Sequence, residues 1–470
     1  MQRAIIIFTS VIMLFSCTSN FEEINTNPNN PEYAPLINVF SYTIEEMASL
    51  YGETEMKYPA AFAGYVTKGT YTDVTNYMIA PSSVVWSGIY IDILTNINYV
   101  IAGAEKEGNK NLQAAAIIVK NYALQLAVDI YGKVPYSEAG QASGGLIHPK
   151  FDDEKTIYYD MLNSLKIANA LFDEAKGGEI GESDILYQGD VNKWKKFGNS
   201  LRLRMAIRIS NIDEAKSKEE IALILNSPEE NPTFESNADN ALLAYPGSDW
   251  VEPWTKEHNT VGDSYIAKPI VDTLLEYADP RIAFYAEPMA NGNYLGLEVG
   301  TEADTEFSRV NNQFVNNPTG AVWFMKYTEV ELIKAEAILR GFVTGNAGEA
   351  YQNAIAASCN EYGIADTAIA AYMLQPKVKW DNNLKQVYVQ KWISLFRQCW
   401  EAWAEMRRTN VPTLLPASHS AYTGHNCTPL RFPYPDSEKK LNSANIPTSV
   451  SEDDYYWGYQ IWWDTRSGVK

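Results

Sequence analysis

Apolar residues recur every three to four positions along much of the chain, which is the spacing of one face of an α-helix. The pattern is strongest over residues 385–408, where Tyr388, Trp392, Cys399 and Trp403 fall on one face that we expect to be buried. We therefore predict a mostly α protein. The expected helices cover residues 36–51, 84–104, 112–130, 156–175, 191–209, 268–277, 330–342, 347–362 and 385–408.

The helix expected at 191–209 also carries a run of basic side chains. A basic run on a helix is usually a solvated face whose charges pair with nearby acids. We expect that arrangement here, because the chain as a whole is acidic. The residues concerned are Lys193, Lys195, Lys196, Arg202, Arg204 and Arg208.

Two stretches, 64–81 and 231–320, lack a steady period and are rich in Pro, Gly, Asn and aromatic residues. Loops this long inside a compact domain are uncommon unless they bind something. Aromatic side chains without a helical face to bury them are candidates for exposed contact area, and Asn supplies donors and acceptors beside them. The candidate ligand-binding residues are Tyr71, Tyr77, Trp250, Trp254, Tyr294 and Asn293.

The composition supports a binding role for these stretches. The chain holds 12 Trp and 30 Tyr, more than a core requires, so some rings should lie at the surface. The formal charge of -20 argues against nucleic acid and anionic lipid as partners. With 470 residues, of which 46% are hydrophobic, the chain can form one large domain or two to three ordinary ones.

The N-terminus has the pattern of an exported lipoprotein. Arg3 precedes an apolar run over residues 4–15, which is too short to span a bilayer because about 20 apolar residues are needed. Ser16 stands directly before Cys17, and Leu14-x-x-Cys17 resembles a bacterial lipobox. We predict cleavage after residue 16 and acylation of Cys17 with palmitate-like chains, two or more of which anchor a protein stably. The alternative is a secreted protein with a chance cysteine at its cleavage site.

The sequence offers little for catalysis, metal or cofactor binding. It contains no Gly-x-Ser-x-Gly, His-Glu-x-x-His, phosphate-loop or dinucleotide motif, so we expect no enzyme and no cofactor. His419, His425 and Cys427 are candidate metal ligands at a spacing unusual for zinc, and we expect no metal. Cys359 and Cys399 complete an odd set of three with Cys427, so at most one disulfide can form.

Adjacent acidic pairs keep one enzymatic alternative open. Asp152 with Asp153, or Asp453 with Asp454, would have to face each other across a sugar to act as the acid and base of a glycoside hydrolase. Adjacent Asp residues more often lie in turns or at helix starts.

Several separated motifs resemble the SusD/RagB family of outer-membrane lipoproteins, and their order covers nearly the whole chain. They are Phe21-Glu22-Glu23-Ile24-Asn25-x-Asn27-Pro28-Asn29-x-Pro31, Asp129-x-Tyr131-Gly132-x-Val134-Pro135-Tyr136, Asp279-Pro280-Arg281 with Tyr294-x-Gly296, and Arg431-x-x-Tyr434-Pro435-x-x-Glu438 with Trp462-Trp463-Asp464.

The resemblance implies a single SusD-like body with tetratricopeptide-like helix pairs, of which 330–342 with 347–362 is the clearest, although no strict repeat is visible. We expect a signal peptide at 1–16, a lipidated tether at 17–35, and the body at 36–470 with a loop-rich insertion at about 231–320.

The implied function is nutrient capture at the cell surface. Such a lipoprotein is expected to bind glycan without chemically changing it and to deliver the glycan to a TonB-dependent SusC-like transporter in the outer membrane. The alternatives are a peptide-binding RagB-like member, a surface glycoside hydrolase, and a structural subunit of the transporter without a ligand of its own.

Overall fold

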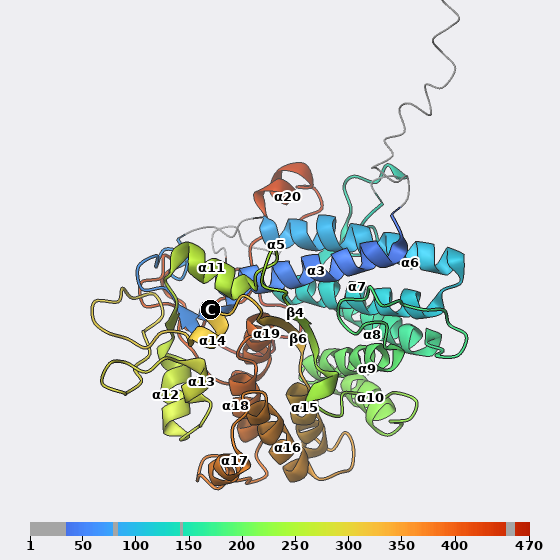
Figure 1. The fold of residues 1–470 in the computed structure, drawn as a ribbon. Coiled ribbons are helices and arrows are strands. Elements are labelled where there is room, and N and C mark those ends of the chain that lie inside the picture. The colour runs from blue at the N-terminus through green and yellow to red at the C-terminus, as the bar shows by residue number, and fades with distance from the viewer. Residues whose placement is uncertain (1–33, 79–82, 142–143, 448–455) are drawn as a thin grey trace, which may run out of the picture.

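Helices dominate the computed structural model, which describes residues 34–78, 83–141, 144–447 and 456–470 (Figure 1). The fold is mostly α, as the periodicity predicts, and forms the single globular body that the family resemblance implies. The predicted signal peptide at 1–16, the lipidation site Cys17 and nearly all of the tether to residue 35 lie outside the described residues.

The helices range from single turns to 22 residues, and the strands are short. The helices are α3 (Leu36–Glu55), α4 (Pro59–Phe62), α5 (Val84–Ser87), the π-helix η1 (Gly88–Leu94), α6 (Thr95–Glu107), α7 (Lys110–Tyr131), α8 (Glu154–Leu171), α9 (Val191–Arg208), α10 (Glu214–Leu225), the 3-10 helix η3 (Asn237–Asp239), α11 (Pro253–Val261), α12 (Lys268–Glu276), α13 (Ile282–Tyr285), α14 (Asn312–Val315), α15 (Tyr327–Leu339), α16 (Ala347–Asn360), α17 (Asp366–Met373), α18 (Leu384–Ser394), α19 (Cys399–Thr409) and α20 (Asp436–Leu441). The strands are β1 (Val66–Thr67), β2 (Val134–Pro135), β3 (Phe151–Asp152), β4 (Ala241–Ala244), β5 (Tyr265–Ile266) and β6 (Ala321–Met325).

Consecutive helices from α6 to α10 pack against one another on the right of Figure 1. The connections from α6 to α7 and from α9 to α10 are short, which makes each of these pairs antiparallel. Each helix of the group buries one face on the next. Asn109 begins α7 by accepting a hydrogen bond from the Leu112 amide, and Asp190 and Asp213 begin α9 and α10 in the same way. The side chains between these helices form the largest hydrophobic cluster of the body.

The joined helices α5, η1 and α6 run from Val84 to Glu107, and by length and composition they qualify as a membrane span. Ile89, Ile93 and Ile97 are fully buried against the neighbouring helices, however, so this is a core helix of the body.

A second group, α15 to α18, lies at the bottom of Figure 1, and α15 packs extensively on α16. This pair occupies the stretch in which a tetratricopeptide-like pair is predicted. The prediction of one continuous helix over 385–408 is wrong, because the helix is interrupted between α18 and α19. Arg397 adopts a positive φ of 74° in the break, where its guanidinium pairs with Glu252 at 2.6 Å.

The antiparallel β4–β6 ladder closes the base of the loop-rich insertion. Ala244 pairs with Ala321, so the chain leaves the helical body after β4 and returns at β6. The insertion contains α12, which matches the helix predicted at 268–277, and also α11, α13 and α14. The sequence did not predict the other three, because helices this short show no long hydrophobic period. Strand β1 pairs with β5, which attaches the first irregular stretch to the insertion.

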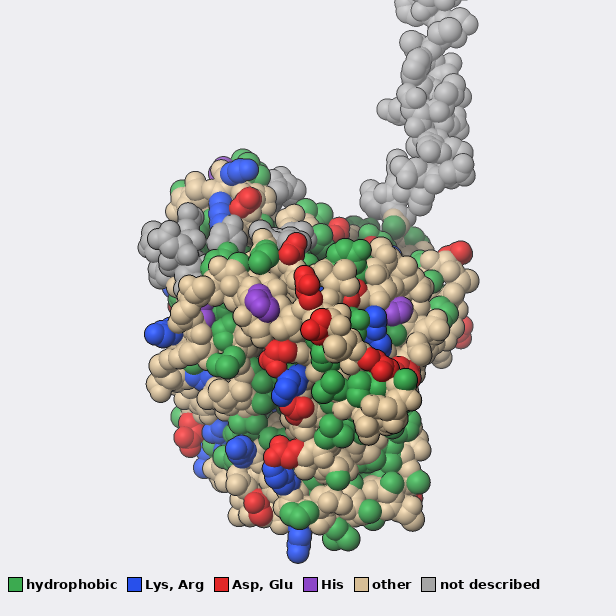
Figure 2. Space-filling view, turned by 90° about the vertical axis from the view of Figure 1, so that its left-hand side faces the viewer, with side chains coloured by type: hydrophobic (Ala, Val, Ile, Leu, Met, Phe, Trp, Pro, Cys, Tyr) green, Lys and Arg blue, Asp and Glu red, His purple; other side chains and the backbone are tan. Residues whose placement is uncertain are grey.

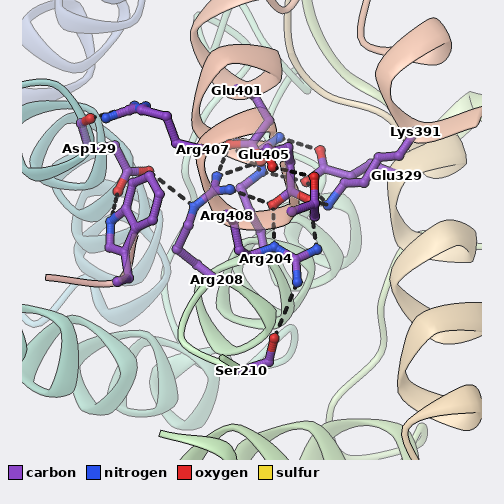
Figure 3. A network of polar contacts seen from close by, with 12 residues as sticks. Asp129, Arg204, Arg208, Ser210, Glu329, Lys391, Glu401, Glu405, Arg407 and Arg408 are labelled. Carbon is purple, nitrogen blue, oxygen red and sulfur yellow. Dashed lines mark hydrogen bonds and ion pairs between the residues drawn. The ribbon is translucent and has the colours of Figure 1, made fainter. Parts of the chain in front are cut away.

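A buried network of charged side chains joins the helix groups (Figure 3). Arg204 and Arg208 of α9 contact Glu329 of α15 at 2.6 Å and Glu401 of α19 at 2.5 Å. Arg408 of α19 binds Glu336 of α15 through two hydrogen bonds of 2.7 Å. The further members are Asp129, Lys391, Glu405 and Arg407.

The basic run on α9 is therefore not a solvated face. Arg202, Arg204 and Arg208 are at most 2% exposed. Their partners come from α10, α15 and α19, which sequence spacing does not bring together. Only the lysines at the start of α9 stay partly accessible to solvent, as expected.

The network sets the charge states of its own members. Burial raises the pKa of Glu401 to about 7, with Arg208 and Arg204 opposing the shift. Burial also disfavours the charge of Glu405, but Arg408, Lys391 and Arg208 outweigh it and hold the pKa of that carboxyl well below its ordinary value. Such pairs are costly to break, because removal of one partner leaves a buried charge without compensation.

Replacing Arg408 by Leu should lower the free energy of unfolding by about 3–5 kcal/mol, since Glu336 and Glu405 lose their shared partner inside the protein. Denaturant unfolding measures this change. Lys268→Ala is the matched control, because it breaks an exposed pair with Asp272 and should cost no more than about 1 kcal/mol. Equal effects of the two substitutions would contradict the structural role of the network.

Candidate ligand-binding face

The insertion and the first irregular stretch form one face of the protein, which Figure 2 turns toward the viewer. Backbone and uncharged side chains cover most of this face, and acidic and basic groups are interspersed among them. The face therefore suits a neutral, polar ligand better than an ionic one.

Helix α11 crosses this face and is fixed at its N-terminus. Glu252 accepts a hydrogen bond from the Thr255 amide at 2.9 Å, and Pro253 occupies the first helical position. The Glu252 carboxylate also pairs with Arg397. The dipeptide Glu252-Pro253 was thus a helix-start signal within the insertion, and Gly262, at φ 65°, ends the helix.

Trp254 is fully buried, so the expectation that it is exposed is wrong. Its ring lies 6.0 Å from that of Phe396 and carries the Arg397 guanidinium at 4.2 Å. The second residue of α11 faces inward against the α18–α19 break, and this tertiary contact is what buries the ring. Trp254 thereby packs the first turn of α11 against the core.

Trp250, four residues earlier, is 51% exposed. It closes a turn in which the Gly247 amide donates to the Trp250 carbonyl at 3.0 Å. The Glu252 amide then donates to the Pro318 carbonyl at 3.1 Å, which fixes the turn beside the returning chain. The indole is consequently held outward at the N-terminal end of α11.

Tyr71 is 60% exposed at the other end of α11. Its loop is held by Asp263, which follows that helix and is itself buried. The Asp263 carboxylate accepts hydrogen bonds of 2.9 Å from the amides of Gly69, Thr70 and Tyr71. A Cβ at Gly69 would lie 2.4 Å from the Tyr265 ring, so only glycine permits this close passage.

Tyr77 is buried, and the expectation that it is exposed is also wrong. Its ring packs against Phe62 and Trp457, and its hydroxyl accepts a hydrogen bond from the Ala417 amide at 3.3 Å. The C-terminal segments therefore cover a ring that the local sequence leaves open.

Tyr294 is half-buried and Asn293 is exposed. The Asn293 amide donates to the Asn291 side chain at 2.9 Å, and the Asn293 carbonyl accepts from the Met289 amide at 2.8 Å. The chain then passes to Leu297, which pairs with the backbone of Ile266 and Lys268. Tyr294 partly packs on the hydrophobic cluster beneath the insertion and leaves only part of its ring accessible.

Three polar side chains of α11 lie exposed between Trp250 and Tyr71: Lys256, Asn259 and Thr260. Their spacing places them on one face of the helix. Nine residues of helix span about 13 Å, so the two aromatic rings flank a polar strip of roughly that length. Sequence reasoning missed the strip because it missed α11.

Two lysines share one carboxylate beneath the Tyr71 end, and an arginine binds a tyrosine hydroxyl there. Glu257 pairs with Lys68 at 3.4 Å and with Lys57 at 3.7 Å, while Arg309 donates to the Tyr265 hydroxyl at 2.8 Å. Burial lowers the pKa of His258, and the cations Arg309 and Lys68 lower it further. The imidazole is thus biased toward its neutral form.

The remaining candidates have structural roles or lie outside the face. Asp152 accepts hydrogen bonds from the amides of Tyr136 and Ser137, and Asp153 starts α8. His419 contacts the Gly300 carbonyl at 3.0 Å, and no group of three or more metal-ligating side chains is found in the parts of the chain that the structure describes. Cys359, Cys399 and Cys427 are free and buried, whereas Asp453 and Asp454 lie outside the described residues.

Comparisons with known proteins place this geometry in context. A family model described as "Starch-binding associating with outer membrane" matches residues 28–435. No match was found among curated proteins.

Solved structures match over most of the chain. A chitin-binding protein is 26% identical with a TM-score of 0.81, over 92% of this chain and 100% of that one. A SusD homologue from Bacteroides uniformis is 25% identical with a TM-score of 0.77, and the match covers 92% of this chain and 98% of that one. A chitin-binding SusD homologue from Flavobacterium johnsoniae is 21% identical with a TM-score of 0.80, over 92% and 99%, and supports the fold alone.

Replacing Asp263 by Ala should loosen the loop that carries Tyr71, because three backbone amides lose their common acceptor. We expect hydrogen exchange of residues 69–71 to accelerate by about tenfold or more. Exchange measured by mass spectrometry tests this. Asp249→Ala on the Trp250 turn is the control and should leave residues 69–71 unchanged. Unaltered exchange in Asp263→Ala would refute the role assigned to the carboxylate.

Proposed function

Because the chain belongs to the SusD-like family, we propose that it binds a glycan at the cell surface without chemically changing it. The family match over residues 28–435 is the observation that carries the proposal. The chitin-binding protein that is 26% identical over nearly the whole chain favours chitin-derived oligosaccharides as first ligands to test, beside the starch-derived ones that the family description names.

The ligand-binding face supports this proposal chemically. Sugar rings have apolar faces that stack on aromatic side chains and hydroxyl edges that need donors and acceptors. Trp250 and Tyr71 supply exposed rings at the two ends of α11, and Asn259 and Thr260 supply polar groups between them. Elsewhere in the insertion, Tyr294 supplies a half-buried ring and Asn293 an exposed amide. An extended oligosaccharide lying along α11 meets both rings.

The geometry suits capture rather than turnover. The exposed surface of α11 carries Lys256, Asn259 and Thr260, and the nearby Asp263 is committed to three backbone amides. A glycosidase needs two carboxyl groups facing each other across the scissile bond. The strip between Trp250 and Tyr71 offers no such pair among the residues that the structure describes on α11.

We further propose that the protein is a lipoprotein that delivers its glycan to a TonB-dependent SusC-like transporter. The proposed organisation is a signal peptide at 1–16, acylation at Cys17, and a tether that ends where α3 begins. A flexible tether keeps the body at high effective concentration over a membrane partner while leaving it free to turn.

Removing both exposed rings, in Trp250→Ala with Tyr71→Ala, should weaken oligosaccharide binding by about tenfold or more, because the stacking surfaces are lost. Isothermal titration with chitin-derived and starch-derived oligosaccharides measures the change. The melting temperature should stay nearly constant, since exposed substitutions cost little stability.

Tyr42→Ala is the matched control for that experiment, because Tyr42 is 48% exposed on α3, outside the insertion and the first irregular stretch. It should bind like the wild type. Binding of peptides instead of any oligosaccharide would favour the RagB-like alternative, and product release from the sugar would favour a hydrolase.

Replacing Cys17 by Ala should move the protein from the membrane fraction to the soluble fraction, because the proposed acylation site is lost. Cell fractionation with immunodetection measures the partition. The purified variant should unfold at the wild-type temperature, since the first described helix begins at Leu36. Full retention in the membrane fraction would contradict the lipid anchor.

A further inference from the structure

A polar groove of about 420 Å³ lies away from the ligand-binding face, between η3 and the α15–α16 pair. Ser236 and Asn237 form one side, Tyr327 at the start of α15 forms the second, and α16 forms the third. A volume of this size lies within the range of small-molecule sites, about 300–1,000 Å³.

Helix α16 presents a face with amides at both ends of the groove. Asn353, Ala356, Ala357 and Asn360 follow one another at helical spacing and line the groove. The two exposed amides are seven residues apart, about 10 Å along the helix, and the small alanines between them leave the space open. The Asn353 side-chain nitrogen already donates to Glu331 at 3.3 Å, so the face offers the Asn353 side-chain oxygen and the Asn360 carboxamide above a shallow apolar floor.

Asn237 adds an acceptor without a partner. Its side-chain nitrogen donates to the Ala357 carbonyl at 2.9 Å, which fixes the orientation of the amide. Its side-chain oxygen is buried and has no hydrogen-bond partner in the structure. A buried polar atom in this state is costly unless a donor reaches it. This oxygen has almost no exposed surface, so a ligand hydroxyl in the groove supplies such a donor only when the Asn237 side chain shifts to expose it.

Tyr327 supplies a half-buried aromatic ring opposite these amides. Its backbone amide donates to the Asn240 side chain at 2.6 Å, which fixes the backbone that carries the ring. Burial raises the pKa of its hydroxyl to about 12, with Glu331 and Asp239 adding to the shift, so the hydroxyl keeps its proton. The charged neighbours are paired, Glu331 with Lys334 at 2.8 Å and Lys326 with Glu361 at 2.9 Å.

We propose that this groove is a second saccharide-binding site, separate from the face that carries Trp250 and Tyr71. No charged side chain lines it among the described residues, which favours a neutral ligand. Carboxamides, a serine hydroxyl and one aromatic ring together match the hydroxyl or N-acetyl groups and the apolar face of a pyranose. The ligand class rests on the proposed function, but the site does not.

The β4–β6 ladder separates the two sites. Asn237 and Asn240 precede β4 and Tyr327 follows β6, whereas the Trp250 turn follows β4 at the opposite end of the ladder. Four strand residues span about 13 Å. A single sugar ring therefore cannot occupy both sites, and a disaccharide is too short to bridge them, so the full protein should bind two equivalents of a disaccharide.

Ala356→Phe, which fills the groove, tests this proposal by isothermal titration with the dimers of N-acetylglucosamine and of glucose. We expect the wild type to bind two equivalents of at least one dimer, and Ala356→Phe to bind one. Gln352→Phe is the matched control, because it adds the same ring at an exposed position of α16 that does not line the groove. It should keep both equivalents.

Two double variants at exposed positions, one for each site, separate a loss of binding from a loss of folding. Asn353→Ala with Asn360→Ala changes two exposed side chains and should weaken the groove equivalent by about tenfold or more at an unchanged melting temperature. Trp250→Ala with Tyr71→Ala should remove the other equivalent. One equivalent in the wild type, unaffected by the groove variants, would overturn the second site alone. No binding of either dimer, or of the longer chitin-derived and starch-derived oligosaccharides, would overturn both the proposed function and this site.

Discussion

Pairing of buried charges is the constraint on which the helical body depends. The arginines of α9, Arg204 and Arg208, have no solvent to hydrate them and are held by acids of α7, α15 and α19. The positions of those helices are therefore coupled, because a shift of one leaves charges of the others uncompensated. Hydrophobic burial gives the helices their affinity for one another, and the ion pairs fix which helix meets which.

The same principle extends from the core to the ligand-binding face. Arg397, in the break between α18 and α19, pairs with Glu252 and stacks on Trp254, so α11 is fixed to the core at its first turn. The Asp263 carboxylate then fixes the loop at the other end of that helix. The two exposed rings thus lie on loops that are fixed at the two ends of α11. Binding of the proposed extended glycan would therefore cost little conformational entropy.

The β4–β6 ladder divides the surface into two regions with different chemistry. At the end of the ladder where the insertion begins, exposed aromatic rings flank a polar strip. At the opposite end, carboxamides and one tyrosine line a groove beside α16. For the proposed capture of a glycan, two separate sites would be an advantage, because binding at one raises the effective concentration of the chain at the other.

The sequence by itself determined the helical class and most of the long helices, because a face of side chains at helical spacing depends only on local positions. It also identified the irregular stretches and the family resemblance. The exposure of single residues was decided only by the tertiary structure. Trp250 and Trp254 look alike in sequence, yet one is exposed and the other is fully buried against the α18–α19 break. Likewise, the basic residues of α9 are core residues only because acids from α10, α15 and α19 meet them there, and burial depends on partners that are distant in sequence.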